Sequence, residues 1–324
     1  MDIKALISQP VAKELEAFDK AFSRSLESDS SKMQAVVDYI QQSNGKRIRP
    51  VVLLLSALLS GKVTDTSVES AVLIELLHTA SLLHDDVVDE TEKRRGIPSV
   101  NAVFDNKIAI LSGDYILSVS LHKAIEIGDF GILSVFGQLG KYLSLGELNQ
   151  LSNVRELNFT EEDYFKVIRE KTAMLFSACT EIGALSANAS GECVTALRSY
   201  GENIGMCFQI RDDIFDYFDS KEIGKPTGND IREGKVTLPL LYALDRAGEG
   251  KREELMSILR SYDLTEENVK SLISFAKESG GIEYAEQKMS VYADRAVADL
   301  AVFPDCEAKA ALLKLVEFVV KRKM

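Results

Sequence analysis

Apolar residues recur at intervals of three and four along almost the whole 324-residue chain. This spacing matches the turn of an α-helix, which takes about 3.6 residues, and runs that alternate apolar and polar residues are hard to find. Apolar residues make up 46% of the sequence, which is ample for a buried core. The sequence therefore predicts an all-α protein.

Glycine, proline and helix-capping residues interrupt this spacing and mark where helices are expected to begin and end. The predicted helices cover residues 11–26, 32–41, 49–59, 65–89, 107–127, 131–150, 160–188, 192–218, 238–246, 253–261, 265–278, 284–302 and 305–320. The helix over residues 131–150 is apolar nearly all round, which predicts that it is enclosed. Since no linker separates the helices, we predict one large helical domain over residues 1–324.

Composition and charge exclude several classes of protein. The net charge of −12 argues against a nucleic-acid partner, because recognition of nucleic acid requires a basic face. The longest apolar stretches, such as Val51–Leu59, are shorter than the roughly 20 residues that span a bilayer, and the start of the chain lacks the apolar run of a signal peptide. We therefore expect no transmembrane segment and a cytoplasmic location.

An acidic cluster ends the predicted helix over residues 65–89. Asp85 and Asp89 are four residues apart and share one helix face, while Asp86 is three residues from Asp89, so the three carboxylates can converge. The C-terminal end of a helix disfavours carboxylates, and a bound Mg²⁺ would turn this cost into binding. A solvated acidic helix end is the alternative interpretation of a single cluster.

The same Asp-Asp-x-x-Asp pattern recurs far downstream as Asp212, Asp213 and Asp216. These acids again follow an apolar helical run and precede a loop that contains glycine, lysine and proline. Two solvated helix ends that share this five-residue pattern are less plausible than one. The repetition therefore favours a paired metal site, with the two acidic clusters facing each other.

Cations gather near these acids in the sequence. They are Lys46, Arg47, Arg49, Arg94, Arg95, Lys171, Lys225 and Lys235. The last two flank a polar, glycine-bearing segment over residues 221–235, which is either a mobile flap or an ordinary surface connection. Six carboxylates for metal ions and several cations for anionic oxygens describe a site for diphosphates, in which the metal makes diphosphate a leaving group. No P-loop or Ser-His-Asp pattern offers a rival chemistry.

The ordered set of motifs resembles the trans-polyprenyl diphosphate synthases, which elongate isoprenoid chains head to tail. The motifs are Gly45-Lys46-Arg47-x-Arg49-Pro50, His84-Asp85-Asp86-x-x-Asp89, Arg94-Arg95-Gly96, Gly113-Asp114-Tyr115, Gly146-Glu147, Lys171-Thr172, Phe208-Gln209-x-x-Asp212-Asp213-x-x-Asp216 and Gly224-Lys225. The resemblance covers most of the chain and implies an all-helical isoprenoid synthase fold around a deep central cavity, usually in a homodimer. One departure is Asn44, where many relatives have a second glycine.

The resemblance also implies an Mg²⁺-dependent condensation of an allylic diphosphate (dimethylallyl, geranyl or farnesyl) with isopentenyl diphosphate, with several Mg²⁺ ions at the site. The implied catalytic residues are Asp85, Asp86, Asp89, Lys171, Asp212, Asp213 and Asp216, of which Asp85, Asp89 and Asp212 ligate metal and the other acids do so directly or through water. The residues that would hold the allylic diphosphate are Arg94, Lys171, Thr172, Gln209, Lys225 and Lys235. Those for isopentenyl diphosphate are Lys46, Arg49, His78 and Arg95. For His78, a buried core histidine is the alternative.

Small residues on the helix that leads to Asp85 bear on product length. Ala80 and Ser81, five and four residues before Asp85, leave a product channel open one helical turn below the acids. Candidates for a deeper floor are Leu77, Ile74, Leu117 and Leu121. We therefore expect an all-trans product longer than the fifteen-carbon farnesyl chain.

Two other functions remain open within the resemblance, and a third is disfavoured. One is a short-chain synthase that makes farnesyl or geranylgeranyl diphosphate. Another is a non-catalytic partner subunit of a prenyl synthase, although such a subunit should have lost acids, and this chain keeps all six. A terpene cyclase is disfavoured, because that class usually replaces the second acidic cluster with an Asn/Ser/Glu pattern.

Overall fold

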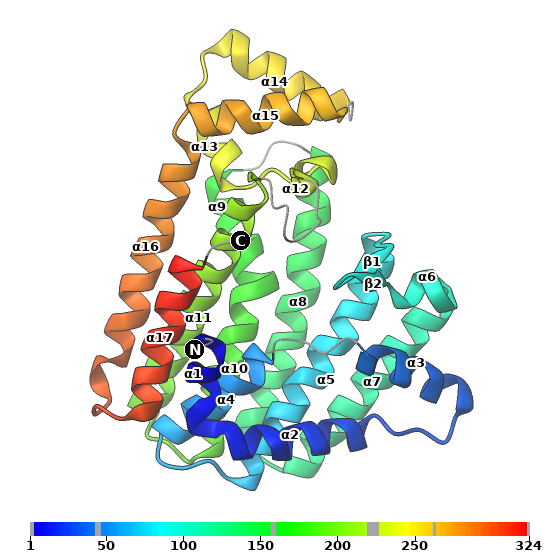
Figure 1. Cartoon of the computed structure of the whole chain (residues 1–324), viewed down its shortest axis with the longest axis vertical. Coiled ribbons are helices and arrows are strands. Elements are labelled where there is room, and N and C mark those ends of the chain that lie inside the picture. The colour runs from blue at the N-terminus through cyan, green and yellow to red at the C-terminus, as the bar shows by residue number, and fades with distance from the viewer. Residues whose placement is uncertain (1–2, 43–46, 157–159, 219–226, 262–263, 323–324) are drawn as a thin grey trace. The chain divides into compact units, whose positions relative to one another are not determined.

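The computed structural model describes residues 3–42, 47–156, 160–218, 227–261 and 264–322, without the side chains of residues 153–156 (Figure 1). Lys46 and Lys225, both predicted to bind diphosphate, lie outside the described residues, as does Asn44.

The chain divides into two compact units, and each unit combines segments that are distant in the sequence. The first unit comprises Met1–Gly140, Ala178–Arg198 and Val302–Leu312, and the second comprises Lys141–Ser177, Ser199–Ala301 and Leu313–Met324. Four helices contribute residues to both units: α8 (Phe130–Glu156), α10 (Met174–Ser186), α11 (Gly191–Phe215) and α17 (Glu307–Lys321).

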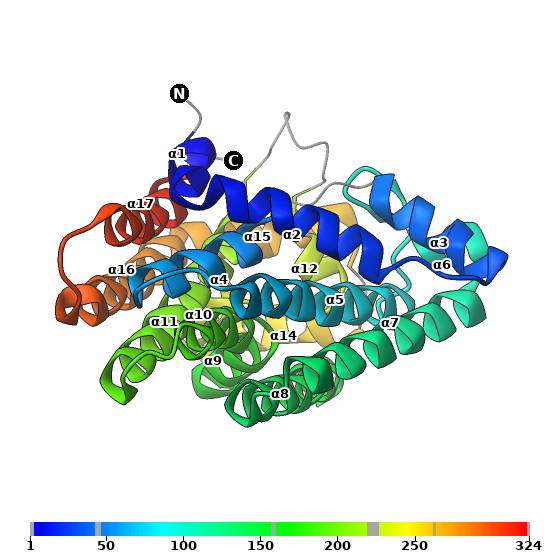
Figure 2. The same cartoon turned by 90° about the horizontal axis from the view of Figure 1, so that it is seen from below.

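The first unit has α5 as its central helix. Its elements are α1 (Ile3–Ser8), η1 (Gln9–Val11), α2 (Ala12–Ser25), α3 (Ser31–Gln42), α4 (Ile48–Leu59), α5 (Asp65–Val88), β1 (Lys93–Arg94), β2 (Ile97–Pro98), α6 (Val100–Phe104) and α7 (Asn106–Ile127). Helix α5 packs against α2, α4 and α7, and Figure 2 shows it between α2 and α7. Since its residues from Ser70 to His78 are all buried, α5 can deliver the acidic cluster at its end only in one orientation.

The second unit gathers around α13. Its remaining elements are α9 (Glu161–Ile168), η2 (Arg169–Ala173), α12 (Asn229–Arg232), α13 (Leu238–Arg246), α14 (Glu249–Ser261), α15 (Glu266–Glu278), α16 (Gly281–Asp299) and η3 (Leu300–Val302), the last ending in the first unit. Helix α13 packs against α9, α15 and α16. Tyr200 and Tyr217 are the largest side chains that are fully buried in this unit.

The all-α prediction is confirmed, since the only strands in the described residues are the two-residue β1 and β2. The short helices α1 and α6 were not predicted, because segments of five or six residues are too short to show a helical period. The predicted helix over 160–188 is interrupted by η2, a π-helical turn over Arg169–Ala173. One domain around a central cavity stays a prediction.

The prediction that the helix over 131–150 is enclosed is wrong for a single chain. In α8, Leu148 is 62% exposed and Phe130 is 86% exposed. Helix α7 also exposes large apolar side chains, among them Leu111 and Ile125. It is the one helix in the described part of the chain that could cross a membrane by length and composition, with 33% of its most apolar stretch buried.

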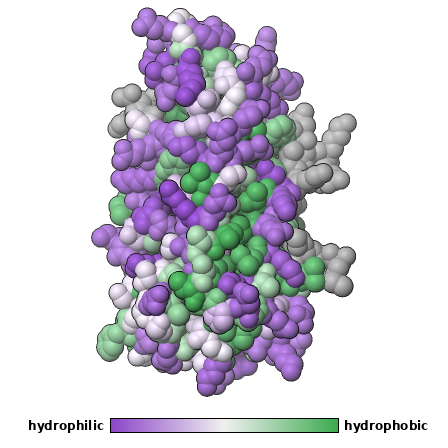
Figure 3. Space-filling model, turned by 90° about the vertical axis from the view of Figure 1, so that its left-hand side faces the viewer, coloured by the Kyte–Doolittle hydropathy of each residue, from purple (hydrophilic) through white to green (hydrophobic). Residues whose placement is uncertain are grey.

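Apolar side chains also gather on the face of the molecule where α16 lies, as Figure 3 shows in green. Val291 and Val297 are the large apolar residues that α16 exposes. Single exposed apolar side chains such as these two valines are common in folded proteins.

Candidate active site

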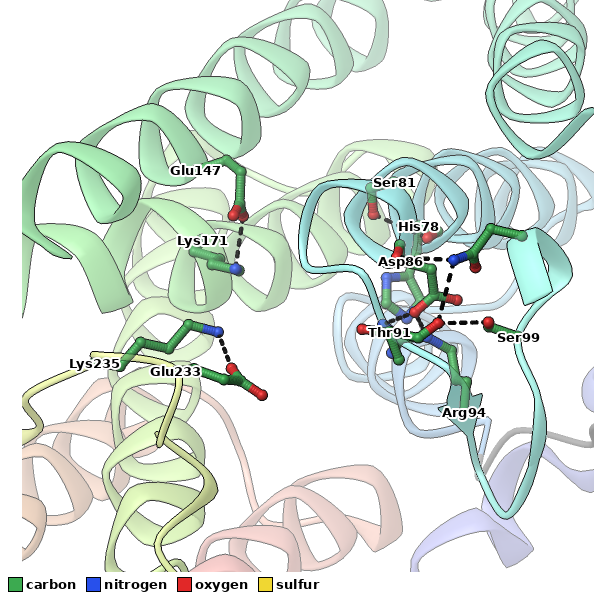
Figure 4. A network of polar contacts seen from close by, with 11 residues as sticks. His78, Ser81, Asp86, Thr91, Arg94, Ser99, Glu147, Lys171, Glu233 and Lys235 are labelled. Carbon is green, nitrogen blue, oxygen red and sulfur yellow. Dashed lines mark hydrogen bonds and ion pairs between the residues drawn. The ribbon is translucent and has the colours of Figure 1, made fainter. Parts of the chain in front are cut away.

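The first acidic cluster has a buried aspartate at its centre. Asp86, at the end of α5, is 2% exposed, and one of its carboxylate oxygens accepts hydrogen bonds from Nε and Nη2 of Arg94, each at 2.6 Å (Figure 4). Its backbone carbonyl accepts from the amide of Thr91 at 2.9 Å and from the side chain of Asn101 at 3.3 Å. Asp86 therefore holds Arg94 and the chain that follows α5.

A hairpin places Arg94 beside this carboxylate. Strands β1 and β2 are antiparallel, with Arg94 opposite Ile97. The turn between them uses two left-handed residues, Arg95 at φ 54° and Gly96 at φ 85°, and only glycine adopts this conformation without steric cost. The sequence Arg94-Arg95-Gly96 thus reverses the chain and keeps both guanidinium groups next to the end of α5.

Asp85 and Asp89 flank the buried Asp86 and are partly exposed. They belong to the last turn of α5, where the amide of Asp89 donates to the carbonyl of Asp85 at 2.8 Å. Being four residues apart, their carboxylates leave the helix on one face. These two acids are therefore the ones in the first cluster that a ligand from solution can reach.

A cavity of about 210 Å³ lies beside this cluster in the first unit. Its charged and imidazole groups are Arg47, Glu75, His78, Asp86, Arg94 and Arg95. Burial, and then the positive charges of Arg49, Arg95 and Arg94, hold the pKa of His78 well below its ordinary value of 6.5. His78 is therefore a neutral hydrogen-bonding group in a cavity whose positive charge comes from arginines.

Arg47 is a member of this cavity that the sequence places among the cations near the acids but assigns to neither substrate. Its guanidinium pairs with Glu75 at 3.3 Å and with Asp19 at 3.2 Å, and it lies over the rings of Phe18 and Phe22. Glu75 is only 6% exposed, so the ion pair is largely removed from water. A buried glutamate in the apolar run of α5 was the signal in the sequence for such a cation.

In the second unit, Lys171 has a fixed position in the π-helical turn η2. Its Nζ lies 2.6 Å from a carboxylate oxygen of Glu147 on α8 and donates to Oε1 of Gln150 at 3.3 Å (Figure 4). Gly146 makes this approach possible, because a Cβ there would lie 2.8 Å from the amide nitrogen of Lys171. Glu147 thus pairs with this lysine and fixes its amine.

The centre of the second acidic cluster is also buried, but its partners carry no charge. Asp213 is 4% exposed and accepts hydrogen bonds from Oη of Tyr164 at 2.6 Å and from Nε2 of Gln209 at 2.7 Å. Gln209 in turn accepts from the hydroxyl of Thr172 at 2.7 Å. Burial raises the pKa of Asp213 to about 7, although both hydrogen bonds lower it.

These groups line a second cavity, of about 250 Å³. Its polar lining is Gln150, Tyr164, Lys171, Thr172, Gln209, Asp213, Asp230, Lys235 and Thr237. Asp230 was not predicted, because a lone aspartate between glycines and arginine reads as a surface residue. Burial, followed by the charges of Asp213 and Asp216, raises the pKa of Asp230 well above its ordinary value.

Asp212 is paired with a residue from the end of the chain. The guanidinium of Arg322 contacts its carboxylate and lies over the rings of Phe208 and Phe215, 4.4 Å and 5.1 Å from their centroids. The carbonyl of Arg322 accepts a hydrogen bond from Arg211 at 2.8 Å. No motif marks Arg322, so this contact was not predicted.

The sequence matches the family described as polyprenyl synthetase over residues 30–276. This chain belongs to that family. It is 34% identical over 317 residues to the octaprenyl diphosphate synthase of Escherichia coli, with 98% of each protein covered. A solved structure of geranylgeranyl pyrophosphate synthase from Bacteroides thetaiotaomicron is 43% identical, covers 99% of this chain and 100% of its own, and has a TM-score of 0.86.

A second solved structure adds information about ligands. The polyprenyl synthase of Caulobacter crescentus, complexed with calcium and isoprenyl diphosphate, is 32% identical, with 99% and 98% of the two chains covered and a TM-score of 0.93. Membership of the family makes this chain a prenyltransferase that elongates trans-polyprenyl diphosphates and depends on a divalent metal. The predicted family and enzyme class are therefore confirmed.

Within each unit of this polyprenyl synthetase, most predicted binding residues share a cavity. His78, Arg94 and Arg95 line the first cavity, and Arg49 is close enough to His78 to lower its pKa. The members of the second cavity that were predicted are Lys171, Thr172, Gln209, Asp213 and Lys235. Asp216 is engaged elsewhere, since both of its carboxylate oxygens accept backbone hydrogen bonds from α12.

The residues predicted to set product length differ in their burial. Ile74, Leu77 and Ala80 are buried inside the first unit, and Ser81 is partly exposed, with its hydroxyl donating to the carbonyl of His78 at 2.9 Å. The other two, Leu117 and Leu121 on α7, are 39% and 49% exposed. Their role as a channel floor stays a prediction.

In the described residues, no three His, Cys, Asp or Glu side chains converge as a preformed metal cage. Mg²⁺ is commonly held by one or two carboxylates, and substrate phosphates and water complete its octahedron. The partly exposed Asp85 and Asp89 are oxygen donors of this kind. The donor set therefore fits a hard divalent ion that binds together with diphosphate.

Proposed function

We propose that this polyprenyl synthetase condenses an allylic diphosphate with isopentenyl diphosphate, and that the metal it uses is Mg²⁺. The observation that carries the proposal is the presence, in each unit, of a cavity that combines cations with the buried central aspartate of an acidic cluster. Diphosphate is the ligand that such cations and carboxylate-bound metal ions bind jointly.

Asp85, Asp89 and Asp212 are proposed to hold several Mg²⁺ ions on one allylic diphosphate. When bound, the ions supply Lewis acidity that stabilises the departing diphosphate. Asp86 and Asp213 are proposed to have another task, because protein donors already engage one carboxylate oxygen of Asp86 and both of Asp213. They keep Arg94 and Gln209 in place for the diphosphate.

The other residues of the second cavity are proposed to bind the allylic diphosphate, together with Arg94. They are Lys171, Thr172, Gln209 and Lys235. Lys225, which lies outside the described residues, is proposed to bind the same diphosphate. Lys171 is the best positioned of them, since Glu147 and Gln150 fix its amine. Because Glu147 already holds this amine in place, little side-chain entropy is lost when the amine also binds the diphosphate.

The first cavity is proposed to bind isopentenyl diphosphate through His78 and Arg95, with Arg49 close to His78. Lys46, which lies outside the described residues, is proposed to bind the same diphosphate. The neutral His78 provides a hydrogen bond and no charge, so the arginines neutralise the diphosphate. In the reaction, the carbon–oxygen bond of the allylic diphosphate breaks and its electron pair leaves with diphosphate. The double bond of isopentenyl diphosphate forms the new carbon–carbon bond, and the proton then lost goes to the released diphosphate. The apolar walls exclude water, which would otherwise react with the allylic carbocation that forms when the carbon–oxygen bond breaks.

The product is proposed to be longer than fifteen carbons, because Ala80 and Ser81 are small. Phenylalanine at position 80 would fill the space one turn below Asp85. The A80F variant is therefore expected to make a shorter product than the natural enzyme, as measured by chromatography of the dephosphorylated prenols. An unchanged product length would show that the floor lies elsewhere.

A second copy of this chain is the proposed partner. Helix α7 exposes Leu111, Leu121 and Ile125, and α8 exposes Phe130 and Leu148. Large apolar side chains exposed along one helix are typical of interaction surfaces. A homodimer would also cover the helix that the sequence predicts to be enclosed. Light scattering should give a mass twice the 35.8 kDa of one chain, and the L111E/L148E double variant should give a single-chain mass. A cytoplasmic location without a transmembrane segment or nucleic-acid partner stays a prediction.

The activity is tested with the purified protein, Mg²⁺, labelled isopentenyl diphosphate and a set of allylic diphosphates. Chromatography of the dephosphorylated products is expected to show elongated prenols only when Mg²⁺ is present. The D245N variant is a matched control, because Asp245 is an exposed acid on α13 that pairs only loosely with Arg252 at 3.8 Å. Absence of elongation with every primer would refute the proposed activity.

A further inference from the structure

Asp216, the third acid of the second cluster, joins the end of α11 to the segment over residues 227–235. One carboxylate oxygen accepts from the amide of Asn229 and the other from the amide of Asp230, each at 3.0 Å. The backbone carbonyl of Asp216 accepts from the amide of Gly228 at 2.8 Å. The carboxylate and the backbone carbonyl of Asp216 thus both accept hydrogen bonds within the protein. The carboxylate accepts from the first amides of α12, as a helix cap does.

Gly228 fixes the same segment from its other side. It has φ 78°, a left-handed conformation that glycine adopts without strain. A Cβ at this position would lie 2.6 Å from Val269 and 2.9 Å from Ile273, both on α15. The start of the segment is therefore held between Asp216 and α15, so its position depends on the hydrogen bonds to Asp216.

The hydrogen bonds continue from Asp216 to Lys235. The amide of Asp230 donates to Asp216, and the carbonyl of Asp230 accepts from the amide of Lys235 at 2.7 Å. The side chain of Lys235 reaches the second cavity, which Lys171 and Thr172 also line. Its Nζ pairs with Glu233 at 2.6 Å, as Figure 4 shows. Two consecutive hydrogen bonds thus connect the third acid of the cluster with a diphosphate-binding lysine.

We propose that Asp216 is a positioning residue that fixes Lys235 in the diphosphate cavity and that it does not ligate metal. The inference rests on the proposed function, in which Lys235 binds the allylic diphosphate. It assigns different tasks to the three acids of one motif: Asp212 faces the metal, Asp213 orients Gln209, and Asp216 attaches the segment that carries Lys235. A metal ligand and a cap respond differently to asparagine, because asparagine keeps one of the two acceptor oxygens that the amides of α12 use and is a poor substitute for an anionic ligand.

The test compares the D216A and D216N variants with the natural enzyme and with the D245N control. Hydrogen exchange in the absence of substrate should be faster for the amides of residues 228–235 in D216A, with a much smaller change in D216N. The KM for the allylic diphosphate should rise about tenfold in D216A and less than about threefold in D216N, the range expected for loss and retention of a cap. The KM for isopentenyl diphosphate and the Mg²⁺ concentration for half-maximal rate should not change.

A double variant shows whether Asp216 acts through Lys235. If it does, D216A adds little to the rise in allylic KM that K235A causes alone, so the two effects are not additive. Equal loss of activity in D216N and D216A with a raised Mg²⁺ requirement would show a metal ligand and overturn the proposal. Unchanged hydrogen exchange in D216A would overturn it as well, even if the enzyme is fully active. Absence of elongation by the natural enzyme refutes the proposed function instead, since the exchange experiment uses no substrate.

Discussion

The two acidic clusters have the same sequence pattern and differ in how the protein treats the middle aspartate. Asp86 and Asp213 are both buried, at 2% and 4% exposure. Arg94 neutralises Asp86 with two hydrogen bonds at 2.6 Å, whereas Asp213 receives its hydrogen bonds from the uncharged Tyr164 and Gln209. The first cluster therefore contains its own counter-charge, and the second keeps a carboxyl whose pKa burial raises to about 7.

This difference separates recognition of the motif from knowledge of its chemistry. A pattern of three acids predicts three equivalent ligands, but in both clusters the middle acid is an anchor for another side chain. Burying an unpaired charge is costly, so a buried carboxylate either pairs with a cation or binds a proton more tightly. In the first cluster Asp86 pairs with the cation Arg94, and in the second cluster Asp213 binds a proton more tightly.

The largest effect should come from the first acid of each cluster, which the two clusters are proposed to use alike. Asp85→Asn and Asp212→Asn should each lower kcat about a thousandfold, because loss of a metal-binding carboxylate removes several kcal/mol of charge stabilisation in the transition state. Steady-state rates with saturating Mg²⁺ measure this, with D245N as the control. A loss in only one of the two variants would show that the clusters do not share the task.

The middle acids should then separate the two clusters. Asp86→Asn removes the counter-charge of Arg94 and should lower kcat/KM about thirtyfold, the consequence of losing a charged hydrogen bond of about 2 kcal/mol. Asp213→Asn should lower it less than about fivefold, because burial raises the pKa of Asp213 to about 7 and its partners are neutral. Equal losses in both variants would refute the distinction between the clusters.

The helical fold could be predicted because the apolar period is read directly from residues such as those of α5 and α4, whose packing follows from their own sequence. The same argument failed for α8, because the period identifies an apolar surface and not the partner that covers it. The sequence shows that Leu148 is apolar, but only the structure shows that its side chain is 62% exposed in a single chain.

The site was predictable where one short motif contains its own chemistry. Arg94 and Asp86 are eight residues apart, and the hairpin between them is marked by Gly96, so their pairing follows from local sequence. In the second cluster, Tyr164 contacts Asp213, which is 49 residues away in the sequence, and Arg322 contacts Asp212, which is 110 residues away. No local pattern carries such long-range contacts, and therefore sequence reasoning missed both residues.

A smaller effect concerns pH and belongs to the first unit. The pKa of His78 is depressed in the folded protein, so below about pH 6.5 the unfolded chain binds a proton that the folded chain does not. The free energy of unfolding should therefore fall as pH decreases from 7 to 5, by up to about 1.4 kcal/mol per pH unit from this group. Urea unfolding of H78Q should lack this part of the slope, and an identical slope in H78Q would show that His78 is protonated in the fold.

The smallest effect concerns the counter-charge of Asp212. Arg322 contacts this carboxylate, and a metal ion that binds there must compete with a guanidinium that is 12% exposed. Asp212 itself is 42% exposed, so water weakens the ion pair to about 1 kcal/mol or less. Arg322→Gln should therefore tighten Mn²⁺ binding by about two- to fivefold, as measured from the free-ion signal in electron paramagnetic resonance. Lys321→Gln is the matched control, because Lys321 is 75% exposed and pairs with Glu317 on its own helix. If R322Q binds Mn²⁺ no more tightly than this control, Arg322 supports Asp212 without competing with the metal ion. Arg322 would then not take the place of the metal ion at the second cluster.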